Sequence, residues 1–229
     1  MNTQEYSQIL RLHLLDMARV IQRGVDNAIK AYKLGNPDFC AIVQGHTYDI
    51  DVPHREITEL VRELLAMELP DESNLRYLLA SERIANAMRV VHSQAVEIAA
   101  NSMRIVDNGG GLGCAELATM GDLVNRLVRL SVVALFNEDV EHAELVQRSS
   151  GAGRLFESTF YDWYRTIDHN ARAQAEFERA ITKHLRHIAL QTYEVAEAIV
   201  FWLEDSVGAS ATDAGERRLA SYDIGRNSR

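Results

Sequence analysis

Two arginines, Arg89 and Arg186, occupy the same place in two copies of one apolar pattern, 97 residues apart. A guanidinium binds carboxylates and other oxyanions through forked hydrogen bonds, but it cannot ligate a metal. Three interpretations are open: an exposed helix edge without a special role, ion pairs with acids from earlier helices, or an anion site that would take phosphate. The pattern consists of Ile84, Met88, Val91, Ala95 and Ile98, and then of Ile181, Leu185, Ile188, Thr192 and Val195.

Two aspartates stand three residues before a histidine, a spacing that also occurs among metal ligands on helices. Asp51 precedes His54 and Asp139 precedes His142, much as in the Glu-x-x-His pairs of di-iron bundles. Those sites use glutamates and need two further inward glutamates. We therefore interpret both aspartates as helix caps.

No pattern of nucleophiles or phosphate-binding loops indicates an enzyme. The sequence contains no nucleophile elbow, no paired serine and histidine, and no Walker motif. The glycine-rich run 109–113 follows a predicted helix and has no lysine after it, so we interpret it as a linker. Cys40 and Cys114 follow no metal or redox spacing and are expected to be reduced thiols. We expect no catalytic residues and no cofactor.

Composition and charge exclude several other classes. The 229 residues include 33 acids and 24 lysines and arginines, for a net charge of -9 and a pI near 5.4, whereas nucleic-acid binding needs clustered cations. No apolar run approaches the ~20 residues of a membrane span. The first residues resemble no signal peptide. We expect a cytoplasmic protein without membrane insertion.

The apolar spacing predicts long helices, because side chains at steps of three and four share one helical face. Gly35-Asn36-Pro37 and Pro70 supply strong breaks. The remaining stretch, 207–229, is small and polar and is expected to be a flexible C-terminal tail. The six predicted helices cover about 4–34, 38–68, 74–106, 115–136, 139–168 and 171–205.

A second gap-free match indicates that the chain is a tandem duplication. At an offset of 103, residues of the first helix correspond to residues of the fourth: Met17, Val20, Ile21, Arg23, Val25 and Ala31 to Met120, Leu123, Val124, Arg126, Val128 and Ala134. We predict an all-α fold of two three-helix bundle repeats, 1–107 and 114–206.

Each middle helix carries a disruption at a similar place. Pro53 lies inside the second predicted helix, where it removes a hydrogen bond, and the run 149–153 interrupts the fifth. We expect a kink or break at each; the alternative is a helix that restarts with Asp51 as its cap. The fifth helix also carries aromatic residues that either pack in the core or form a partner-docking patch: Phe156, Phe160, Trp163 and Tyr164.

The chain resembles the PhoU family of phosphate-uptake regulators over about 4–205. The run LRYLLASERIANAMRVVHSQAVEIA, 75–99, is similar to the family's third helix, and KHLRHIALQTYEVAEAIVFWL, 183–203, to its last. The region 17–38 resembles its opening helix, and Asp49 with Asp51 resembles the acidic pair of its second helix.

The resemblance also locates a departure. In the family, a Glu and an Asp four residues apart on the third and sixth helices ligate iron or zinc. Here those positions hold Arg89 and Ser93, and Arg186 and Leu190, so we predict that this metal site is absent. The alternative is a displaced site among Asp49, Asp51, Glu97, Glu194 and Glu197.

The resemblance implies a regulator of phosphate homeostasis. Such a protein is a cytoplasmic adaptor, often a homodimer, that links the ATPase subunit of a phosphate ABC transporter to a sensor histidine kinase and represses the phosphate-starvation response. Two alternatives are an accessory protein of a different transporter and a metal-binding helical-bundle protein.

Overall fold

The computed structural model is helical in the part of the chain that it describes, which is residues 3–67, 71–149, 158 and 172–223, with side chains as far as Leu203. No strand occurs among these residues, which confirms the predicted all-α class. The helices within the described residues are α1 Thr3–Leu34, α2 Pro37–Gly45, α3 Thr47–Met67, α4 Glu72–Asp107, α5 Ala115–Asn137, α6 Val140–Ser149 and α8 Arg172–Asp223.

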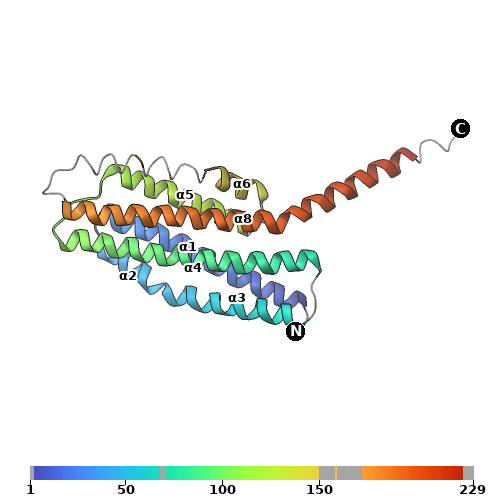
Figure 1. The fold of residues 1–229 in the computed structure, drawn as a ribbon, viewed down its shortest axis with the longest axis horizontal. Coiled ribbons are helices and arrows are strands. Elements are labelled where there is room, and N and C mark those ends of the chain that lie inside the picture. Colours follow the sequence, from blue (N-terminus) through green and yellow to red (C-terminus); the bar gives the residue numbers. More distant parts are fainter. Residues whose placement is uncertain (1–2, 68–70, 150–157, 159–171, 224–229) are drawn as a thin grey trace.

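The two longest helices, α4 and α8, form the centre of the molecule (Figure 1). Helix α1 packs against α3 and α4, and α5 packs correspondingly against α6 and α8. Buried side chains from all of these helices form one continuous hydrophobic core. The two predicted halves therefore share a single interior, although the boundaries at 107 and 114 remain a proposal.

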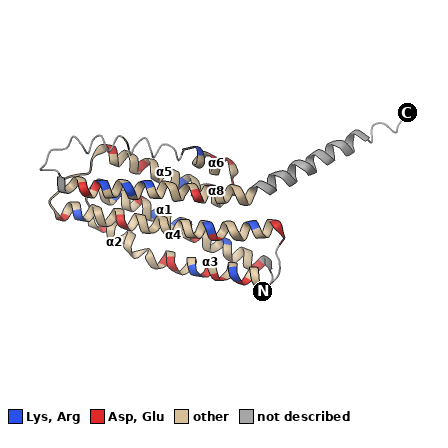
Figure 2. Ribbon diagram, viewed as in Figure 1, with Lys and Arg blue, Asp and Glu red and all other residues tan. Residues whose placement is uncertain are grey.

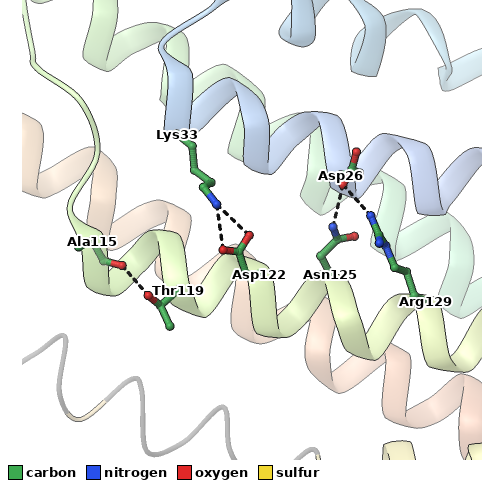
Figure 3. Close-up of polar contacts among 7 residues, drawn as sticks. All are labelled: Asp26, Lys33, Ala115, Thr119, Asp122, Asn125 and Arg129. Atoms are coloured by element: carbon green, nitrogen blue, oxygen red, sulfur yellow. Dashed lines mark hydrogen bonds and ion pairs between the residues drawn. The ribbon is translucent and has the colours of Figure 1, made fainter.

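Helices α1 and α5 meet through residues that the duplication makes equivalent (Figure 3). Asp26 Oδ1 accepts hydrogen bonds from Asn125 Nδ2 at 2.8 Å and from Arg129 Nη2 at 3.1 Å. Asp26 and Arg129 are 103 residues apart, which is the repeat offset. A residue that contacts its counterpart in the other repeat lies next to the two-fold axis that relates the two repeats.

A second contact occurs twice across the same helix pair. Lys33 Nζ lies 3.0 and 2.9 Å from the two carboxylate oxygens of Asp122. The offset of 103 converts Lys33 to Phe136 and Asp122 to Arg19, and the Arg19 guanidinium indeed lies over the Phe136 ring, 5.1 Å from its centre. The two equivalent pairs of positions are therefore both in contact, although one contact is an ion pair and the other a cation on an aromatic ring. This agreement supports the proposed duplication.

The ends of α1 and α5 are also equivalent. Gly35 and Glu138, again 103 residues apart, both adopt left-handed backbone, with φ of 59° and 54°. This conformation ends helices and favours glycine. Next in the chain, Asn36 caps α2 and Asp139 caps α6: Asp139 Oδ1 accepts from the His142 backbone N–H at 3.1 Å. The capping interpretation of Asp139 is confirmed.

The first middle helix is broken, as expected, but the position was wrong because the break does not lie at Pro53. The chain breaks at His46, between α2 and α3, while Pro53 lies within the second turn of α3. Gly45 is a poor helix former. The Thr47 hydroxyl, which donates to the Gln44 carbonyl at 2.9 Å and lies 3.3 Å from buried His92 of α4, holds the chain at this break. Asp51 therefore lies inside α3 and is not its cap.

The ends of α6 and α8 can be compared with the predicted helix ends only where the residues are described. Helix α6 ends at Ser149, at the start of the predicted interruption, and residues 150–157 lie outside the described part. The backbone of α8 continues to Asp223, past the predicted end near Asp205. Residues 224–229 of the expected tail are outside the described residues as well.

Candidate functional site

A groove opens beside the α2–α3 break, between α3 and α4. It measures roughly 820 Å³. The residues that line it include two arginines, one carboxylate and one histidine: Gln44, Gly45, Thr47, Tyr48, Asp51, His54, Arg55 and Arg89. Of the residues that the sequence analysis selected, this groove brings together Arg89, Asp51 and His54.

Arg89 forms an ion pair across the groove. Its Nε donates to Asp51 Oδ1 at 3.0 Å, and the two side chains are 57% and 44% exposed. Solvent screens such a pair, which contributes about 0–1 kcal/mol to stability. One turn further, His54 Nε2 lies 2.8 Å from Asn86 Oδ1 of α4. These two contacts join α3 to α4 along one side of the groove.

Arg55 is the second cation of the groove. Its Nε reaches the Asp51 backbone carbonyl at 3.4 Å, at the long end of a hydrogen bond. The Arg55 side chain is exposed. Arg55, Arg89 and Asp51 thus line the same groove, with Arg89 on the Asp51 carboxylate and Arg55 on its backbone carbonyl.

A buried histidine of α4 contacts the first residue of α3. His92 of α4 is 4% exposed, and its Nε2 lies 3.3 Å from Thr47 Oγ1. Because the Thr47 hydroxyl already donates to Gln44, we assign the hydrogen to His92 Nε2. Its Nδ1 is buried without a partner beside Gly24. Burial, with a smaller contribution from His46, lowers the pKa of His92.

The second copy of the site is only partly described. Arg186 and Leu190 lie exposed on α8, as Arg89 and Ser93 do on α4. The segments 150–157 and 159–171, which belong to the fifth predicted helix and its surroundings, lie outside the described residues. The aromatic docking candidates fall in the same segments: Phe156, Phe160, Trp163 and Tyr164.

Within the described residues, no group of three or more histidine, cysteine, aspartate and glutamate side chains is arranged to hold a metal ion. Two of the acids proposed for a displaced site have another partner. Arg83 Nη2 lies 3.3 Å from Glu194 Oε2 and 2.6 Å from Glu197 Oε2. This bridge joins α4 to α8 (Figure 2 shows the charges along both helices).

Sequence reasoning missed a buried polar cluster that fixes the glycine linker. Glu178 of α8 is 1% exposed, and its Oε1 accepts from Tyr32 Oη at 2.7 Å. Tyr32 Oη in turn accepts from the Cys114 backbone N–H at 2.8 Å. A Cβ at Gly113 would lie 2.2 Å from the Tyr32 ring. At this position glycine serves close packing, so the linker is held against α1 and α8.

No helix among the described residues has the length and apolar character required to cross a membrane.

The described helices and their paired contacts define a class of all-α protein in which the helices before and after the glycine linker share one core. Two solved structures have this fold. The crystal structure of PhoU from Pseudomonas aeruginosa matches with a TM-score of 0.84 and 18% identity, over 89% of this chain and 100% of that one. The phosphate transport system regulatory protein PhoU from Streptococcus pneumoniae matches with a TM-score of 0.76 and 16% identity, over 88% and 96%.

A sequence relative agrees with the fold. The phosphate-specific transport system accessory protein PhoU homolog of Pseudomonas putida is 25% identical over 134 residues, which is 57% of this chain and 52% of the relative. The match thus spans about half the length of that relative. No family model matches the chain. The chain is thus similar in sequence to one PhoU homolog over that stretch, and it shares its fold with the two solved PhoU structures.

Proposed function

We propose that this chain is a regulatory accessory protein of phosphate uptake and has no enzymatic activity of its own. One observation carries the proposal: a sequence match to a PhoU homolog coincides with a fold shared with two PhoU structures over nearly nine-tenths of the chain. The alternatives of a different transporter and of a metal-binding protein have no such support.

The proposed mechanism is that of an adaptor. One surface would dock on the ATPase subunit of a phosphate ABC transporter and another on a sensor histidine kinase, so that the kinase is held inactive when phosphate is plentiful. The single core supports this mechanism, because a rigid body keeps two docking surfaces at a fixed spacing. We further propose that the chain is a cytoplasmic homodimer, which light scattering of the purified protein would test as twice the 25.8 kDa chain mass.

The decisive experiment deletes the gene and measures expression from a phosphate-responsive promoter at high phosphate. We expect expression to rise to its starvation level and to be repressed again by the wild-type gene. Unchanged expression after the deletion would refute the regulatory proposal.

A pull-down separates the proposed transporter from the alternative. The tagged full-length chain is mixed with the phosphate ATPase subunit, with the histidine kinase, and with the ATPase subunit of an unrelated importer. We expect the first two to be captured. Capture of the unrelated subunit alone would assign the chain to another transporter, and stoichiometric iron or zinc in the purified chain would support the metal-binding alternative.

A further inference from the structure

We propose that the groove between α3 and α4 binds a phosphoryl oxyanion, held by Arg89 and Arg55, and that the Asp51 carboxylate competes for the same cation. The proposal concerns the groove alone and does not depend on the proposed regulatory function.

The first argument is that Arg89 already binds an oxyanion in this groove. Its Nε donates to one carboxylate oxygen of Asp51 at 3.0 Å. A guanidinium has five N–H donors in a planar fork, and this one is 57% exposed, so a ligand from solvent can reach it. A phosphoryl group offers three oxygens and close to two negative charges, against one charge on Asp51. It can therefore displace the carboxylate.

The second argument is the local charge. The whole chain carries nine more negative than positive charges. The groove lining reverses this balance, with Arg55 and Arg89 against Asp51 alone. Coulomb attraction at the groove thus favours an anion although the protein as a whole repels one.

Neutral donors and space complete the site. Tyr48, which is 72% exposed, and Gln44 bring a hydroxyl and an amide to the lining. The roughly 820 Å³ of the groove falls in the range of small-molecule sites. It accommodates inorganic phosphate or a phosphate ester, whose organic part would lie along the Tyr48 ring.

The groove also has a fixed frame. The start of α3 is held by Thr47, which contacts buried His92 of α4. The His54–Asn86 contact joins the two helices one turn away. A site on joined helices keeps its arginines in place better than a site on a loop.

The experiment titrates the full-length protein with inorganic phosphate and with phenyl phosphate at constant ionic strength, using calorimetry. We expect saturable binding that Arg89→Gln and Arg55→Gln each weaken about ten-fold, because a charge-assisted hydrogen bond is lost. Arg62→Gln is the matched control, because Arg62 is exposed on α3, as Arg55 is, but lies outside the groove lining. The affinity of this variant for phosphate should be unchanged.

Asp51→Asn gives a test in the opposite direction. If Asp51 competes with the ligand, its neutral replacement releases Arg89, and binding should become about two- to five-fold tighter, in keeping with the small strength of an exposed ion pair. If the Asp51–Arg89 ion pair only holds the groove together, Asp51→Asn should instead weaken phosphate binding, to about the same extent as Arg89→Gln. Circular dichroism confirms that each variant is folded.

The outcomes separate the possible sources of the phosphoryl group. Tighter binding of phenyl phosphate indicates an ester as the ligand, and tighter binding of inorganic phosphate indicates the free ion; either result supports the proposal. Absence of saturation up to about 10 mM, which is weaker than ordinary small-ligand affinity, would overturn it. Equal losses in the Arg62 and Arg89 variants, or weaker binding by Asp51→Asn, would overturn it too.

Discussion

The hydroxyl of Tyr32 is expected to be one of the most consequential single groups for the stability of this fold. Tyr32→Phe removes a 2.7 Å hydrogen bond to the buried Glu178 carboxylate and takes away the 2.8 Å acceptor of the Cys114 N–H, which keeps a longer bond of 3.3 Å to Glu178 Oε1. A hydrogen bond to a charged group contributes about 1.5–3 kcal/mol, and the loss of the shorter of the two bonds of the Cys114 N–H costs about 0.5–1 kcal/mol more. The free energy of unfolding should fall by about 2–4 kcal/mol.

Urea denaturation followed by circular dichroism measures this change, provided that the slope m is unchanged. In a thermal melt the same loss corresponds to about 5–15 °C for a chain of this size. Tyr77→Phe is the matched control, because Tyr77 Oη donates only a long bond of 3.4 Å to the Ser7 carbonyl. A loss below about 1 kcal/mol for Tyr32→Phe, or one no larger than for Tyr77→Phe, would refute the account of the buried cluster.

Three further predictions follow from other parts of the chain. Gly35→Ala should destabilise the fold by about 1–2 kcal/mol because of its left-handed backbone, whereas Gly45→Ala, with open space around it, should be near neutral in the same denaturation assay. The free energy of unfolding should fall as the pH drops below about 6.5, the ordinary pKa of histidine. The pKa of His92 is lowered in the folded state, so the folded protein keeps His92 neutral while the unfolded chain takes up the proton. The loss of stability between pH 7.5 and 5.5 should be smaller in His92→Gln. Restoring the family's ligand positions should let the purified protein take up iron or zinc, and a folded but metal-free variant would contradict the alignment: Arg89→Glu, Ser93→Asp, Arg186→Glu and Leu190→Asp.

Much of the helical layout could be predicted because its signals are local. The end of α1 follows from Gly35, Asn36 and Pro37, which supply a left-handed residue, a cap and a first helical residue in that order. The duplication was visible as matched apolar positions. It could have predicted more, since Asp26 and Arg129 are opposite charges at equivalent positions and prove to be in contact.

The features that escaped prediction depend on contacts between distant segments. The break at His46 is fixed by the Thr47 hydroxyl and by buried His92, 45 residues further along the chain. A proline is the stronger local signal, yet α3 accommodates Pro53. The burial of Glu178 was equally hidden, because a glutamate ordinarily indicates an exposed helix face, and its shortest hydrogen bond comes from Tyr32, 146 residues away.

The Asp26–Arg129 contact has a consequence for how such a chain could arise. In a dimer of identical single units, a residue beside the two-fold axis meets its own copy, so any charge placed there faces an equal charge. Joining the two units in one polypeptide removes that restriction, because each copy can then mutate alone. The Asp26–Arg129 ion pair, at 3.1 Å, can therefore form in the fused chain but not in a dimer of two identical units. They also commit the two halves to each other and disfavour exchange with another molecule's identical half.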